Sequence, residues 1–124
     1  MTMRDSIAAA QIAGPRQEAD GTAVFEFRFG ADDPTFTGHF PRRPILPGVF
    51  QLEMARVAAE AVLNCRLTIR EITKARFLRP IVPAETVRVE LKLSEKSGTI
   101  QARAGFSVHG QPAGETIVVL CRSA

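Results

Sequence analysis

Apolar and polar residues alternate with a period of two in several short stretches of the chain. Such alternation is typical of a β-strand with one buried face, because successive side chains point to opposite sides of the strand. Residues 24–29, VFEFRF, are the clearest example, since phenylalanine and charge alternate there. The same reasoning predicts four later strands, over residues 67–79, 86–93, 99–108 and 115–122. The hairpin turns between the last three are predicted at Lys96-Ser97-Gly98 and Gly110-Gln111-Pro112-Ala113-Gly114.

One stretch has the composition of a helix instead. Residues 49–64, VFQLEMARVAAEAVLN, contain strong helix formers without Gly or Pro, and Pro47-Gly48 form the entry. Apolar residues cover more than half of the circumference, so we expect other structure to enclose this helix. A loose apolar segment over residues 5–18 is interpreted as the first strand. The order of strand, strand, helix and four strands lacks a βαβ rhythm, and it predicts an α+β domain with a mainly antiparallel sheet wrapped around one helix.

Length and composition narrow the class of protein. The 124 residues are too few for two separately cored halves, so we expect residues 1–124 to form a single domain. Hydrophobic and charged fractions of 45% and 23% exclude a disordered chain. The apolar stretches are too short to span a bilayer and the N-terminus has no apolar signal region, which predicts a cytoplasmic protein without a membrane partner. In that compartment Cys65 and Cys121 are expected to be free thiols.

The charge balance is mildly basic. A net charge of +3 with a pI near 9.4 favours an acidic partner. Nucleic acid ranks last among the candidates, because the basic residues are scattered and the chain has no Trp or Tyr for base stacking. Neither cysteine belongs to a metal-binding motif, and the sequence calls for no metal and no cofactor.

The stretch over residues 30–48 carries four Pro and three Gly, so it can form neither a regular helix nor a central strand. A loop of this length that also contains large apolar residues is typical of a functional segment. His39 lies in this loop, and Glu53 lies in the second turn of the predicted helix. Taken singly, His39 fits an ordinary loop residue, and Glu53 fits a solvated helix face shared with Arg56 and Glu60.

The joint pattern is more specific than either residue. The run Gly38-His39-Phe40-Pro41, then Pro44, Pro47-Gly48-Val49 and Glu53 resembles the active-site segment of the 3-hydroxyacyl-[acyl-carrier-protein] dehydratases, the FabZ/FabA group of hotdog-fold proteins. A second block, residues 75–83 (ARFLRPIVP), is similar to the later ARFxRPVxPGD segment of that family. Glu at position 53 is closer to FabZ than to FabA. The resemblance implies a hotdog fold, with an antiparallel sheet of about six strands around one central helix.

The resemblance also implies an activity, the dehydration of (3R)-hydroxyacyl thioesters to trans-2-enoyl thioesters in fatty-acid or related lipid or polyketide biosynthesis. This reaction needs a base for the C2 proton, an acid for the departing hydroxyl, and donors for the charge on the thioester oxygen. By resemblance, His39 is the base and Glu53 is the acid. The backbone amides of Gly48 and Val49, at the positive end of a helix, would hold the oxygen.

Partners follow from the same resemblance. The substrate would arrive on an acidic acyl carrier protein, and the His and the acid would come from different subunits of a homodimer. A hexamer built as a trimer of dimers stays open. Two positions depart from the family pattern: Val57 replaces a customary Gln, and Pro83-Ala84-Glu85 replaces Pro-Gly-Asp. Candidate carrier contacts are Arg42, Arg43, Lys74, Arg76 and Arg79.

Two other functions stay open on the same scaffold. A hotdog acyl thioesterase would share the fold and the thioester substrate, but hydrolysis needs an activated water or a nucleophile, and only Glu53 offers itself. A non-catalytic module that binds an acyl chain or an acyl carrier is the other. Such a binder needs neither His39 nor Glu53.

Overall fold

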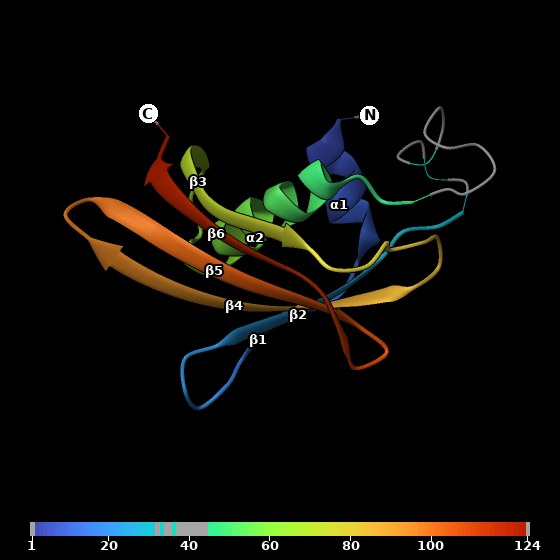
Figure 1. Cartoon of the computed structure of the whole chain (residues 1–124). Helices are drawn as coiled ribbons and strands as arrows, with labels where there is room; N and C mark the ends of the chain where they lie inside the picture. Colours follow the sequence, from blue (N-terminus) through green and yellow to red (C-terminus); the bar gives the residue numbers. More distant parts are fainter. Residues whose placement is uncertain (1, 32, 34–35, 37–44, 124) are drawn as a thin grey trace.

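The computed structural model describes residues 2–31, 33, 36 and 45–123. A single curved antiparallel sheet forms one layer, and two helices lie together on one of its faces (Figure 1). Helix α2, Gly48–Leu63, is the long central helix, and the short α1, Met3–Ala10, packs beside it. The strands follow the order β1-β2-β4-β5-β6-β3 in the sheet, with bounds β1 Gln11–Gln17, β2 Ala23–Arg28, β3 Leu67–Phe77, β4 Thr86–Lys96, β5 Thr99–Val108 and β6 Gln111–Arg122.

This architecture confirms the predicted α+β hotdog fold, in which six antiparallel strands wrap around a central helix. The interpretation of residues 5–18 as one strand is wrong, because the first part of this segment is helix α1 and only its second part is β1. A capping box starts the helix: the Thr2 side chain accepts a hydrogen bond from the Asp5 N–H, and the Asp5 side chain accepts one from the Thr2 N–H. Ile7 and Ala10 are buried on its inner side.

The hairpin between β5 and β6 also differs from the prediction. The predicted turn ran from Gly110 to Gly114, but β6 already begins at Gln111. Only two residues, His109 and Gly110, form the connection, with φ of 52° and 75°. Positive φ at both positions is typical of the two-residue turn whose twist matches that of paired strands. The turn predicted at Lys96-Ser97-Gly98 is confirmed for Ser97 and Gly98, while Lys96 is the last residue of β4.

The core lies between α2 and the concave face of the sheet. Small residues on the helix, Ala55, Ala58 and Ala59, are fully buried and let the helix approach the strands closely. The alternation seen in β5 places every second side chain inside, as predicted for a half-buried strand. The outward side of α2 is open in the single chain, since Val49 and Ala61 are exposed.

The C-terminal half of α2 is tied to its neighbours by Glu60. The carboxylate accepts hydrogen bonds from the Arg4 guanidinium on α1 and, at 2.8 Å, from the Leu67 backbone N–H at the start of β3. Burial alone would raise the pKa of Glu60, but these hydrogen bonds outweigh it and hold the pKa below its usual value. Glu60 is therefore a buried structural group, contrary to the interpretation that placed it on a solvated face.

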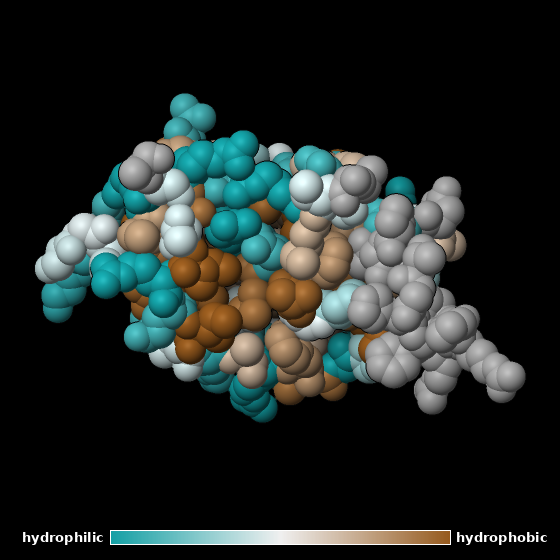
Figure 2. Space-filling model, turned by 90° about the horizontal axis from the view of Figure 1, so that it is seen from above, coloured by the Kyte–Doolittle hydropathy of each residue, from teal (hydrophilic) through white to brown (hydrophobic). Residues whose placement is uncertain are grey.

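Strand β3 lies at one end of the described sheet, next to β6. On its other side it pairs with no described strand, so backbone groups there are without a strand partner. Ile72 and Phe77 on this strand are each 50% exposed. Viewed from the helical side, apolar side chains gather in the middle of the surface (Figure 2). Neither of the two described helices is both long and apolar enough to cross a membrane. Both cysteines are free thiols, as predicted.

Candidate active site

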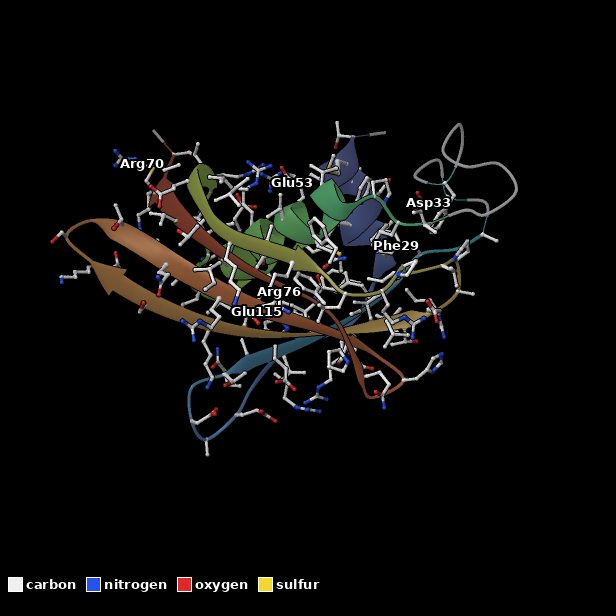
Figure 3. The ribbon with its side chains drawn as sticks, viewed as in Figure 1. Phe29, Asp33, Glu53, Arg70, Arg76 and Glu115 are labelled. Carbon is white, nitrogen blue, oxygen red and sulfur yellow. The ribbon has the colours of Figure 1, made fainter. Side chains whose placement is uncertain are left out.

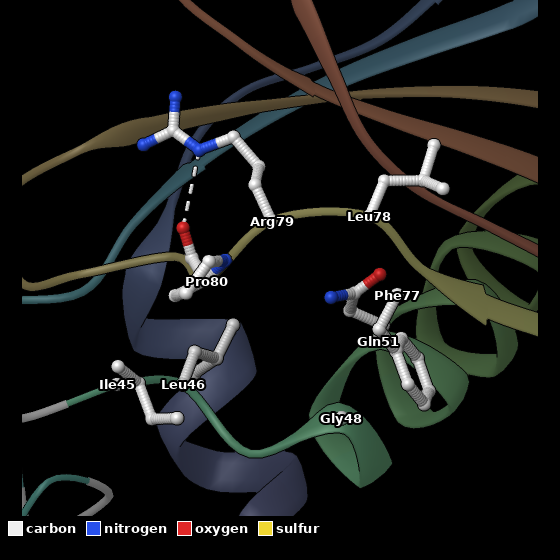
Figure 4. Close-up of a pocket in the computed structure, with 8 residues that line it drawn as sticks. All are labelled: Ile45, Leu46, Gly48, Gln51, Phe77, Leu78, Arg79 and Pro80. Atoms are coloured by element: carbon white, nitrogen blue, oxygen red, sulfur yellow. Dashed lines mark hydrogen bonds between the residues drawn. The ribbon is translucent and has the colours of Figure 1, made fainter.

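A pocket opens where the N-terminus of α2 meets the chain that leaves β3 (Figure 4). Its volume is about 280 Å³. The Leu46 N–H donates to the Ile81 carbonyl at 2.7 Å, which ties the entry of the helix to the segment after β3. The pocket therefore joins the two blocks of sequence that carried the family resemblance. Its walls are Ile45, Leu46, Gly48, Gln51, Phe77, Leu78, Arg79 and Pro80.

Gly48 is the first residue of α2, directly after the N-cap Pro47. A Cβ at this position would lie only 2.7 Å from a ring carbon of Phe77, so a side chain would fit only if the ring moved away. The first N–H groups of a helix have no partner within the helix, and the helix dipole makes this end positive. The bare backbone of Gly48 can therefore approach a carbonyl oxygen in the pocket.

Val49 follows Gly48, but its side chain is 49% exposed and it does not line the pocket. The two backbone amides predicted to hold the oxygen, those of Gly48 and Val49, are thus both at the start of α2. Of these two residues, Gly48 lines the pocket and Val49 does not. Phe77, which closes over Gly48, was part of the second sequence block, although its role could not be read there.

Glu53 lies on another side of α2 from Gly48. Its carboxylate pairs with Arg56 one turn later, at 2.7 Å between Oε2 and Nη2, and the side chain is 20% exposed. Figure 3 places it on the side of the helix that faces away from the sheet. Glu53 is not among the residues that line the pocket at Gly48. A single chain therefore does not bring the predicted acid to the predicted oxygen site.

His39, the predicted base, lies outside the described residues, as do the candidate carrier contacts Arg42 and Arg43. Of the other basic candidates, Lys74 forms an ion pair with Glu115 at 2.9 Å. Arg79 is likewise paired with Glu85. Arg76 is exposed and makes no ion pair within the described part of the chain (Figure 3).

Gln51 is a pocket residue that the sequence did not single out. It lies one turn after Gly48, and its side chain is only 2% exposed. Its Oε1 has no hydrogen-bond partner among the described residues. The available signal was a lone amide at the helical spacing of three from Gly48, between the apolar Phe50 and Leu52. That spacing places an uncharged polar group on the same face as the glycine.

Comparison with known proteins gives a consistent result. Residues 15–114 match the model of the ApeI-like family, described as ApeI dehydratase. The 3-hydroxyacyl-[acyl-carrier-protein] dehydratase FabZ of Desulforamulus reducens is 43% identical over 77 residues, 56% of this chain and 54% of the relative. The FabZ of Pasteurella multocida is 36% identical over 102 residues, 73% of this chain and 66% of the relative. The chain thus spans about half to two thirds of these relatives.

Among solved structures, the dehydratase heterocomplex ApeI:P from Xenorhabdus doucetiae has a similar chain. The match has a TM-score of 0.73 and 26% sequence identity, and it covers 90% of this chain and 96% of the other. The family match covers both stretches of sequence whose residues line the pocket, Ile45 to Gln51 and Phe77 to Pro80. This chain belongs to the ApeI-like dehydratase family.

Proposed function

We propose that this protein removes water from (3R)-hydroxyacyl thioesters carried on an acyl carrier protein and releases trans-2-enoyl thioesters. The observation that carries the proposal is the family match over residues 15–114, together with a side-chain-free helix start at Gly48 in the wall of a pocket. The named relatives support the same reaction, since both FabZ proteins are 3-hydroxyacyl-[acyl-carrier-protein] dehydratases. The reaction would take place in the cytoplasm.

In the proposed mechanism the thioester oxygen accepts hydrogen bonds from the Gly48 and Val49 backbone N–H groups. Neutral His39 takes the C2 proton, and the charge that develops on the oxygen is stabilised by these donors and by the helix dipole. Glu53 gives a proton to the hydroxyl at C3 as the C3–O bond breaks. The C2=C3 double bond forms, water leaves, and the proton held by His39 returns to the carboxylate through solvent.

We infer further that the working site contains two chains. Glu53 does not line the pocket of its own chain, so a second subunit has to bring a carboxylate to it. The unpaired edge of β3 and the half-exposed Phe77 beside the pocket support an interface at this place. We propose a homodimer, while the Xenorhabdus relative is described as a heterocomplex. A hexamer formed as a trimer of dimers is compatible with the proposal.

An acyl carrier protein is the proposed macromolecular partner. The carriers are acidic, and the exposed Arg76 lies on the same strand as Phe77, which lines the pocket. Lys74 and Arg79 are weaker candidates because Glu115 and Glu85 already neutralise them.

The test is to mix the purified protein with a 3-hydroxybutanoyl thioester, once on carrier protein and once on a small thiol, and to follow the absorbance of the conjugated enoyl product. We expect interconversion in both directions, and a loss of about 10²-fold or more in His39→Ala. Release of free thiol, measured with a thiol reagent in the same samples, would instead identify a thioesterase. Tight binding of the acyl carrier without either reaction would identify a binding module and contradict the proposal.

A further inference from the structure

Gln51 is buried in a place where an unpaired polar group is unfavourable. Its side chain is 2% exposed, and its Oε1 makes no hydrogen bond within the part of the chain that the structure describes. Buried polar atoms in folded proteins are nearly always paired, so an exception calls for an explanation. Gln51 also lines the pocket at the start of α2, with the nitrogen of its amide toward the pocket and Oε1 directed away from it (Figure 4).

The sheet is shaped to receive this amide. Gly114 on β6 lies opposite, and a Cβ on it would come within 2.2 Å of the Gln51 Oε1. The Arg76 carbonyl oxygen lies 3.0 Å from the same Cβ position. Two hydrogen-bond acceptors, this oxygen and the Gln51 Oε1, therefore lie close together beside Gly114. A half-turn of a primary amide exchanges its oxygen and its NH₂. In either orientation, one end of the amide faces the sheet and the other end is available to the pocket.

The described residues that line the rest of the pocket offer little polarity. Apart from Arg79, their side chains are apolar. The Arg79 guanidinium is already engaged, because it donates to Glu85 at 2.6 Å and to the Pro80 carbonyl at 3.2 Å. An unsubstituted acyl chain in this pocket would leave the end of the amide that faces the pocket unpaired. A hydroxyl group both donates and accepts, so it can pair with either end of the amide.

We propose that the Gln51 side chain binds a hydroxyl group of the acyl moiety and makes the pocket selective for hydroxyacyl over unsubstituted acyl groups. The inference rests on the proposed function for the identity of the ligand as an acyl thioester. Gln51 has no proton to exchange near neutral pH, so its role is to position and select the substrate. The hydroxyl is either the one at C3, which the reaction expels, or one farther along the acyl chain.

The experiment measures binding without turnover. Butanoyl-, 3-hydroxybutanoyl- and 4-hydroxybutanoyl-pantetheine analogues, in which an amide replaces the thioester, hold their C2 proton too firmly to react. Titration calorimetry with the wild type is expected to give about tenfold or greater preference for one hydroxyacyl analogue over butanoyl. The preferred analogue identifies which hydroxyl is bound. Gln51→Met should bind all three equally.

Thr116→Val is the matched control. Thr116 on β6 is also fully buried with an unpaired Oγ1, but it does not line the pocket. This variant should keep the wild-type preference. Gln51→Met should be folded, since a like-shaped apolar group replaces an unpaired polar one. If thermal denaturation shows that it is not, Gln51→Leu provides the same comparison.

Equal binding of the three analogues by the wild type, binding of none of them, or a preference that survives in Gln51→Met would overturn this inference. The dehydratase proposal is judged separately, by turnover of the 3-hydroxybutanoyl thioester. Turnover without a hydroxyl preference leaves the dehydratase and removes the role of Gln51. A preference that depends on Gln51, in a protein without turnover, supports the role of Gln51 and contradicts the dehydratase proposal.

Discussion

Two glutamates on the same helix, Glu53 and Glu60, have very different surroundings. Glu60 is 9% exposed and accepts hydrogen bonds from Arg4 and from the Leu67 backbone, so its oxygens hold α1, α2 and β3 together. Glu53 is 20% exposed and, among the described residues, its ion pair is with Arg56, its neighbour one turn away. An acid with partners from distant segments stabilises the fold, while an acid with one local partner stays available for chemistry. The proposed catalytic role of Glu53 agrees with this difference.

The largest effect is expected from Glu53→Gln. Turnover of the 3-hydroxyacyl thioester should fall by about 10²-fold or more, because the amide cannot give a proton to the leaving hydroxyl. The melting temperature should change little, since a local pair between neighbouring turns of a helix contributes only about 0.3–0.5 kcal/mol. Parallel assays of rate and thermal denaturation check both expectations. A variant with near-normal turnover would remove Glu53 from the mechanism.

Glu60→Gln should have the opposite profile. The substitution leaves the Arg4 guanidinium without its counter-charge and weakens the link to Leu67, so we expect a loss of about 2–3 kcal/mol in the free energy of unfolding. Denaturant titration measures this loss. Turnover per folded molecule should stay within a few-fold of the wild type at low temperature. A stability equal to that of the wild type would contradict the structural role of Glu60.

A fall in pH should destabilise the folded protein through the Glu60 carboxylate. Because the pKa of Glu60 in the folded protein lies below its ordinary value, 4.5, the folded state binds its proton less readily than the unfolded chain does. This contribution to stability is complete above the unfolded value and is lost as the pH falls through the folded one. Unfolding free energies measured between neutral pH and pH 3 should therefore decline less steeply in Glu60→Gln. Identical slopes in the two proteins would argue against the shift.

Gly48→Ala should affect rate and stability together, but less strongly. The added methyl group meets the Phe77 ring, which is half exposed and can move outward, so we expect a cost of about 1 kcal/mol. Turnover should fall by about tenfold because the methyl group blocks the approach to the backbone amide. Phe77→Ala in the same chain should restore stability but not rate. Restoration of both would indicate that Gly48 serves packing alone.

The smallest effect is expected from a substitution of Arg76, the proposed contact for the acyl carrier protein. Arg76→Glu should raise the KM for a carrier-bound substrate several-fold and leave the KM for a small-thiol thioester unchanged, because the exposed arginine attracts an acidic carrier. The difference should shrink as salt screens the charges. Lys74→Glu is the control, since Lys74 is already paired with Glu115. Equal effects on both substrates would contradict a carrier contact.

The sequence predicted the bounds of an element best where the hydrophobic pattern depends on that element alone. Strand β5 has the predicted bounds, because alternating residues on a half-buried strand carry a period of two. Helix α1 was missed, although Thr2 and Asp5 form a capping box. Its eight residues make only about two turns, which is too short a stretch for the helical spacing of the buried Ile7 and Ala10 to stand out in the sequence. The pattern of polar residues along the predicted helix gave no reason to expect different roles for Glu53 and Glu60. Their difference depends on Arg4 and Leu67, which reach Glu60 only in the folded chain.

The site was predicted as far as its local motifs extend. Gly48 at the start of a helix follows from Pro47 and the helix formers after it, and the structure places it there. The pocket itself depends on the meeting of Gly48 with Phe77, which is 29 positions away in the chain. The importance of Gln51 depends on Gly114 in the opposite strand. Such contacts between distant segments leave no spacing in the sequence from which they could be read.

The central claim, that two chains complete one site, is tested most directly by complementation. His39→Ala and Glu53→Gln should each be nearly inactive alone. If the histidine and the acid of one site come from different subunits, half of randomly mixed dimers are mixed ones, and each of these has one intact site. After mixing under conditions that allow subunit exchange, we expect about a quarter of the wild-type rate. No recovery of activity, in samples where mass spectrometry confirms mixed dimers, would place both residues of a site in one chain and contradict a site shared between two subunits.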